Sequence, residues 1–137
     1  MEKIYSNIEP SALISVIIRA KDLSSYRLDG CPTTEYIQVC GRKLSRGTKV
    51  APHKHIPLQR ESLLTQEVWI ILRGAIKASF YDLDNSFLFR REIQEGDCIV
   101  LLRGGHSLES LEEGTLFYEI KNGPYYSAEA DKENINA

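Results

Sequence analysis

The sequence predicts an all-β protein with an antiparallel sandwich or barrel architecture. Its apolar runs are short, rich in β-branched and aromatic residues, and bounded by glycine-containing turns or polar stretches. After residue 30, no segment keeps the 3.6-residue period of an amphipathic helix for three turns. Strands that follow one another at short spacing, without helices between them, exclude a βαβ fold.

The individual strands are predicted from β-branched composition and from the alternation of apolar and polar residues. The first, ALISVIIR, is almost wholly apolar, and a later pair, IKASFYD and FLFRREI, is typical of a hairpin with its turn near Asp84 and Asn85. The longest predicted loop covers residues 56–65. The predicted strands are residues 12–19, 36–40, 48–55, 67–73, 76–82, 87–93, 98–102 and 115–121.

The length of 137 residues fits a single compact domain. We expect the barrel over residues 31–126, preceded by an N-terminal extension, residues 1–30, whose strand packs on the barrel or on a partner chain. Residues 127–137 are polar and charged, which predicts a tail that is either a short terminal helix or frayed.

Charge and hydropathy indicate which partners and compartments to expect. The net charge is −2, and the basic cluster RKLSRGTK is interrupted by apolar and turn residues, so no nucleic-acid partner is expected. The longest apolar runs fall far short of the ~20 residues that cross a bilayer, and the first residues lack an export signal. We therefore expect a cytoplasmic protein with no membrane partner. Its cysteines, Cys31, Cys40 and Cys98, are expected to be reduced.

Two of the three histidines, His53 and His55, lie two residues apart in the stretch APHKH. On a strand, residues two apart point to the same face, so both imidazoles would reach one ion. An exposed or structural pair explains the same spacing. The two histidines alone do not decide between these readings.

Three further stretches bear on this choice. GTKVAPHKH has the form G-x5-H-x-H, EVWIILRG has the form E-x6-G, and GDCIVLLRGGH runs from a glycine to His106. In this order the stretches resemble the two motifs of the cupin superfamily. The resemblance covers roughly residues 36–121 and implies a cupin-type antiparallel barrel, also called a jelly-roll or double-stranded β-helix.

The resemblance also implies a metal site with His53, His55, Glu67 and His106 as ligands. Nitrogen and oxygen ligands of this kind suit one divalent ion, Fe, Mn, Ni, Co or Zn. Eleven residues separate His55 from Glu67 where the family usually has three or four, so Glu61 competes with Glu67 for the acidic position. Glu67 is preferred because its spacing to Gly74 fits the motif. In the second motif, Leu102 replaces the usual proline and Ser110 the usual asparagine, which makes His106 the least secure ligand.

Alternation predicts further residues of the pocket. If Glu67 points inward, Trp69, Ile71 and Arg73 do so too, while Val68, Ile70 and Leu72 face a second layer or a partner chain. Trp69 is then either a core residue or an aromatic lining of a sugar-sized pocket. Glu119 and Lys121 share a face of the last strand, as a solvated pair or as pocket groups.

The chain end carries a second resemblance. YEIKNGPYYSAEADKE, residues 118–133, is similar to the end of small cupins encoded among bacterial surface-polysaccharide genes. This implies a setting in carbohydrate or nucleotide-sugar metabolism. A weaker similarity is to cupin-type ketoisomerases and epimerases of nucleotide sugars. Cupins of this kind often pair N-terminal strands across a dimer, so we expect a homodimer.

The function expected from these observations is a metal-dependent isomerase, epimerase or oxygenase acting on a sugar, nucleotide sugar or other small oxygenated molecule. With the three histidines assigned to the metal, Glu119 is the first candidate for proton transfer and Tyr125 the second. A non-catalytic module that binds or senses a small ligand, and a structural cupin that has lost activity, remain alternatives.

Overall fold

The computed structural model describes residues 1–135, and this part of the chain is built from antiparallel strands with almost no helix. The prediction of an all-β protein is therefore confirmed. The helical elements are a 3-10 turn at Ala20–Asp22 and the helix α1 at Ala128–Asp131. The strands are β1 (Glu2–Tyr5), β2 (Leu13–Ile18), β3 (Leu28–Asp29), β4 (Cys40–Gly41), β5 (Glu67–Arg73), β6 (Ala75–Tyr81), β7 (Phe87–Gln94), β8 (Cys98–Leu101), β9 (Gly105–Ser110) and β10 (Leu116–Lys121).

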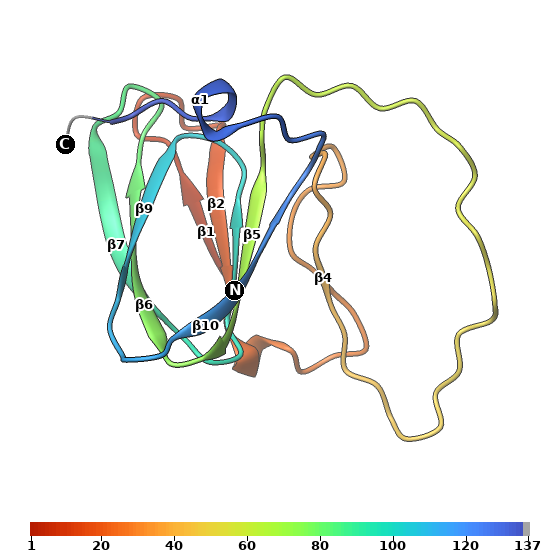
Figure 1. Ribbon diagram of the computed structural model, residues 1–137. Coiled ribbons are helices and arrows are strands. Elements are labelled where there is room, and N and C mark those ends of the chain that lie inside the picture. The colour runs from red at the N-terminus through yellow and green to blue at the C-terminus, as the bar shows by residue number, and fades with distance from the viewer. Residues whose placement is uncertain (136–137) are drawn as a thin grey trace.

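Two sheets face each other and form the body of the molecule (Figure 1). One has five strands in the order β1-β2-β8-β5-β10, and the other has three in the order β7-β6-β9. The chain passes from the first sheet to the second at Gly74, whose φ of +78° lies in the left-handed region that glycine adopts without strain. β3 and β4 form a small third sheet that is not hydrogen-bonded to the other two.

The core between the two sheets is apolar. Trp69 and Ile71 of β5 pack there against Ile76 and Phe80 of β6, and all four side chains are almost completely buried. Burying one such side chain contributes about 1.5–3 kcal/mol, so this layer accounts for much of the stability of the fold.

A second apolar layer covers the opposite face of the five-stranded sheet. Val68 and Val100 lie in it with Val16 and Ile18 of β2, and side chains between Leu23 and Val39 pack on them. The prediction that Val68 and Ile70 face a second layer is confirmed, and the layer belongs to the same chain. Arg73, which was predicted to point inward, is exposed at the strand end.

The N-terminal strand predicted at residues 12–19 joins the main sheet of its own chain. β2 lies inside the five-stranded sheet, paired with β1 on one side and β8 on the other, and each of its six residues is buried. Residues 1–30 therefore hold two strands of the main sheet, and β2 has no free edge for a partner chain. A central strand buried on both faces reads as a continuous apolar run, which explains its composition.

The prediction of a strand at residues 48–55 is wrong. Residues 42–65 contain no strand, every one of them is exposed, and the segment loops away from both sheets (Figure 1). Pro52 and Pro57 have no N–H to donate to a strand partner, which disfavours pairing of this segment. The strand predicted at 36–40 is reduced to β4, and the strand β9 was not predicted. In the part of the chain that the structure describes, no helix combines the length and hydropathy needed to span a membrane.

Candidate functional site

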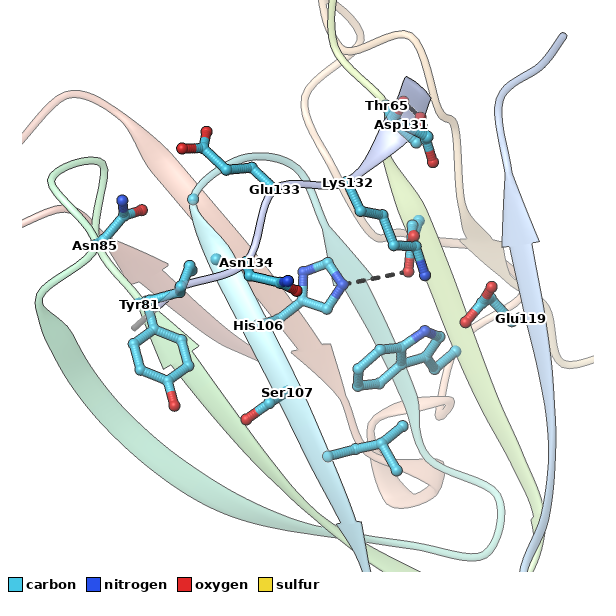
Figure 2. A pocket seen from close by; sticks show the side chains of 16 residues that line it. Thr65, Tyr81, Asn85, His106, Ser107, Glu119, Asp131, Lys132, Glu133 and Asn134 are labelled. Carbon is cyan, nitrogen blue, oxygen red and sulfur yellow. Dashed lines mark hydrogen bonds and ion pairs between the residues drawn. The ribbon is translucent and has the colours of Figure 1, made fainter. Parts of the chain in front are cut away.

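A cavity of about 580 Å³ opens between the two sheets and is bordered by the C-terminal tail. Its size falls in the range of small-molecule sites. Side chains from β5, β6, β9 and β10 meet in it, and most of the residues are polar (Figure 2). The lining residues are Thr65, Glu67, Trp69, Tyr81, Asn85, Gly104, Gly105, His106, Ser107, Leu108, Glu119, Asp131, Lys132, Glu133, Asn134 and Ile135.

Glu67 and His106 come together from opposite sheets. Glu67 begins β5, and His106 lies near the start of β9, so their side chains meet across the space between the sheets. His106 Nε2 lies 3.4 Å from Glu67 Oε2. The dashed line that starts at His106 in Figure 2 marks this contact. Lys121 lies directly opposite Glu67 in the β5–β10 ladder, and its Nζ is 2.8 Å from Glu67 Oε1. Each carboxylate oxygen of Glu67 thus has its own nitrogen partner.

These two partners decide the charge of Glu67. Burial by itself would raise the pKa of its carboxyl group, but the hydrogen bonds and charges of His106 and Lys121 outweigh burial and lower the pKa from 4.5 to about 2. Burial by itself would lower the pKa of Lys121, but the hydrogen bonds and charges of Glu67 and Glu119 outweigh burial and raise it. At neutral pH the site therefore holds a carboxylate beside an ammonium group.

Trp69 forms the wall next to this pair. Its ring meets the His106 imidazole edge to face, with 5.2 Å between the ring centroids, and meets Phe117 at 6.0 Å. The sequence left two readings of Trp69, a core residue or a pocket lining, and both hold: it packs in the core and also lines the cavity. Within residues 1–135, its buried Nε1 has no hydrogen-bond partner.

The C-terminal tail borders the cavity. α1 begins after Ser127, whose hydroxyl accepts a hydrogen bond from the Ala130 N–H, so one of the two tail conformations that the sequence allowed, a short helix, is present. Thr65 Oγ1 donates a hydrogen bond of 2.5 Å to Asp131. Beyond it, Lys132 and Asn134 lie beside His106 (Figure 2), and the Ile135 side chain fills the space that a Cβ on Gly105 would need.

The predicted site residues divide into two groups. Glu67, His106, Trp69 and Glu119 line one cavity, and Lys121 pairs with both of these carboxylates, 2.8 Å from Glu67 and 3.1 Å from Glu119. Tyr125 is exposed and does not line the cavity, although the Lys121 ammonium group lies 5.6 Å from its ring centroid.

The two remaining predicted ligands, His53 and His55, lie in the exposed segment 42–65. Their rings meet at a centroid distance of 5.6 Å, and His53 Nδ1 lies 2.9 Å from the backbone oxygen of Ala51. Glu61 lies in the same segment, where Gln59 donates a hydrogen bond to it. Of the two acidic candidates, Glu67 is the one that faces the cavity.

The predicted four-ligand metal site is therefore not assembled by the side chains as they stand. Glu67 Oε2 and His106 Nε2 converge, but Lys121 occupies the second oxygen of Glu67, and both other histidines belong to the exposed segment. Across residues 1–135, no group of three or more histidine, cysteine or acidic side chains is placed to hold a metal ion. This arrangement does not fit a four-coordinate site.

Several residues of the cavity were not found by sequence reasoning. Tyr81 was placed in a predicted strand without a role, and Asp131 and Lys132 belong to a tail whose polarity and family resemblance gave them no role in the site. For β9, the signal was the alternation of His106, Leu108 and Ser110 with Ser107 and Glu109, which has the strand period but is mostly polar.

Comparison of the chain with protein-family models, with curated proteins and with solved structures found no match.

Proposed function

We propose that this protein is an enzyme that binds a sugar-sized polar molecule in the cavity and moves a proton at it through His106. The observation that carries the proposal is the contact of 3.4 Å between His106 Nε2 and Glu67 Oε2 inside a cavity of about 580 Å³. A carboxylate paired with an imidazole, next to space for a ligand, is an arrangement that supports general acid–base catalysis.

The chemistry follows from the charge of Glu67. In this proposal the ionised carboxylate of Glu67, 3.4 Å from His106 Nε2, is the acceptor that faces the N–H at Nε2. This fixes the tautomer in which Nδ1 carries the lone pair, and Nδ1 is then the atom that takes a proton from the substrate. The carboxylate also stabilises the imidazolium that forms, as the acidic partner does in a catalytic triad.

Other groups around the cavity have supporting roles in this proposal. Lys121 holds Glu67 and Glu119 in place through its ammonium group. Glu119 lines the cavity opposite Trp69 in the β5–β10 ladder and is the second group that would exchange a proton with a ligand. Tyr125 is exposed and does not line the cavity, so we assign it no part in proton transfer.

A metal-dependent reaction is our second proposal, because two of the expected ligands, Glu67 and His106, do converge. It requires His53 and His55 to be delivered by the segment 42–65, and we assign no step to a metal ion. We further propose that the two facing sheets belong to a cupin-type jelly-roll, and that the protein acts in the cytoplasm in carbohydrate metabolism. The cupin assignment is supported by two motif residues: Glu67 begins β5, and Gly74 directly follows its last residue, Arg73.

One pair of histidine variants separates the two proposals. Purified wild-type protein, His106→Ala and His55→Ala are screened for thermal stabilisation by free sugars and nucleotide sugars, with and without added divalent metal, and each hit is assayed for turnover. Proton transfer by His106 predicts a loss of about 100-fold or more in kcat for His106→Ala and wild-type turnover for His55→Ala. A metal site predicts that both variants lose bound metal, measured by elemental analysis, together with activity.

The remaining outcomes point to the non-catalytic alternatives. A sugar that stabilises the protein but gives no product favours a binding or sensing module. If no sugar stabilises the protein and no metal is retained, the enzyme proposal is wrong and a structural protein is favoured.

A further inference from the structure

The buried N–H of Trp69 lacks a hydrogen-bond acceptor within residues 1–135. The side chain is 3% exposed and lines the cavity. Leaving such a buried donor unsatisfied carries a free-energy cost. Contacts with His106 and Phe117 fix the ring, so the position of the donor is fixed as well. An oxygen atom of a ligand would remove this cost.

The neighbouring carboxylates already have partners. Glu119 lies directly across the ladder from Trp69, but its oxygen is 3.1 Å from Lys121 Nζ, and Glu67 is held by Lys121 and His106. Neither carboxylate accepts the Trp69 N–H. The acceptor is therefore expected on the ligand.

The charges around the cavity restrict which ligand group can supply the oxygen that accepts the Trp69 N–H. Four carboxylates line it, from Glu67, Glu119, Asp131 and Glu133, and one ammonium group lines it, from Lys132. Lys121, behind the lining, lies 2.8 Å from Glu67, 3.1 Å from Glu119 and 3.9 Å from Asp131. With both lysines counted, the carboxylates are in excess, four against two.

Groups that recognise phosphate are scarce at this site. Within residues 1–135, no arginine lines the cavity, although arginine is the side chain that best matches the geometry of phosphate oxygens. A phosphate or diphosphate here would face excess negative charge at close range, where repulsion is poorly screened. A hydroxyl group, by contrast, donates to a carboxylate and accepts from an N–H at the same time.

We propose that the cavity selects an uncharged, polyhydroxylated ligand, a free sugar or neutral sugar unit, with one oxygen accepting the Trp69 N–H, and that it discriminates against phosphorylated and nucleotide-linked sugars. This inference rests on the proposed function and narrows its substrate class. It assigns Trp69 a role in binding, next to the proton-transfer role of His106.

The test is a matched binding series measured by calorimetry at low salt. Glucose and N-acetylglucosamine are each compared with their 1-phosphates and their UDP derivatives, on wild-type protein and on Trp69→Phe. Phenylalanine keeps an aromatic ring and removes the N–H. Tyr118→Phe is the control, because it removes a hydroxyl from an exposed side chain of β10 that does not line the cavity. Circular dichroism checks that each variant is folded.

We expect at least one free sugar to bind about tenfold or more tightly than its phosphate, with the difference shrinking as salt is added. Trp69→Phe should weaken binding of the free sugar about tenfold, and Tyr118→Phe should leave it unchanged. If phosphorylated forms bind as well as free sugars, or if folded Trp69→Phe binds like the wild type, this inference is overturned while the proposed function stands. If no member of the series binds, both are overturned.

Discussion

Replacing Glu67 by glutamine should remove a large part of the stability that this protein gains above acidic pH. Glu67 is 4% exposed, so its contacts with Lys121 and His106 are only weakly screened by solvent. Its pKa in the folded state is about 2, against an ordinary value of 4.5. Since one pKa unit corresponds to about 1.4 kcal/mol, the ionised carboxylate contributes about 3 kcal/mol at neutral pH.

The direction with pH follows from the lowered pKa. An acid whose pKa is lower in the folded state stabilises the fold above its unfolded-state pKa, and this stabilisation disappears as the pH falls through the folded-state pKa. For Glu67 the loss begins near pH 5 and is complete below pH 2. Between pH 7 and pH 3, wild-type protein should therefore lose about 2 kcal/mol more stability than Glu67→Gln.

The assay is urea unfolding of both proteins at a series of pH values, followed by circular dichroism. Glu109→Gln is the matched control, because it removes an acidic partner of a lysine, Lys77, in an exposed ion pair. Lys77 also lowers the pKa of Glu109, but solvent screens this exposed pair, so we expect the control to change the pH dependence far less than Glu67→Gln does. If Glu67→Gln keeps the wild-type pH dependence, the acid sensitivity of the fold does not arise at Glu67 and our account of the site is wrong.

Three further predictions concern the core, a cysteine and the assembly. Phe80→Ala should lower the free energy of unfolding by about 3–5 kcal/mol, because the side chain is fully buried and stacks on Phe89. Phe87→Ala, at a half-exposed site, should lower it much less, and denaturant midpoints measure both changes. Burial raises the pKa of the Cys98 thiol to about 12, so a thiol reagent at pH 8 should label Cys98 in the folded protein far more slowly than it labels the unfolded chain. Equal labelling rates for the folded and unfolded protein would contradict this. A homodimer remains our prediction, now through the exposed apolar side chains Leu116, Tyr118 and Ile120 of β10; sedimentation of only a monomer at micromolar concentration would refute it.

The sequence predicted the strands that carry their own alternation and have turn residues at both ends. The run from Glu67 to Leu101 is of this kind, and the predicted bounds of β5, β6, β7 and β8 differ from the observed ones by one residue or less at each end. Gly74, and Asn85 in the predicted hairpin turn, both have a positive φ. Glycine and asparagine adopt this conformation more easily than other residues, so their presence in the sequence indicated the two turns.

Local pattern failed where pairing is decided by distant residues. The stretch around His53 has β-type alternation, but a strand exists only if another strand completes its backbone hydrogen bonds, and the sequence does not state which edges are free. β9 shows the converse: its residues are mostly polar, and its pairing with β6 along the whole of Gly105–Ser110 makes it a strand.

The candidate site was predicted in part for the same reason. Glu67 and Trp69 follow from alternation along one strand, and Lys121 is placed opposite Glu67 by the β5–β10 register. The four-ligand set also required the position of an irregular segment, which alternation does not supply. The contribution of the tail depends on a contact between Thr65 and Asp131, which are 66 residues apart.

The exposed segment 42–65 also divides the molecule into two pieces of chain. Residues 1–41 supply β1 and the inner strand β2, while the other strands of both large sheets come from residue 66 onward. The second piece begins at the buried Gln66, whose side-chain oxygen accepts a hydrogen bond of 2.8 Å from the Ile37 N–H. The two pieces are therefore also hydrogen-bonded to each other where the exposed segment ends. A cut by trypsin after Lys49 or Lys54 breaks one covalent bond and no strand pairing, because β2 remains clamped between β1 and β8. We therefore expect fragment complementation: the two pieces, expressed separately, retain the strands whose ladders would rebuild one fold, and the segment between them is where we expect a reporter or a new pair of termini to be tolerated.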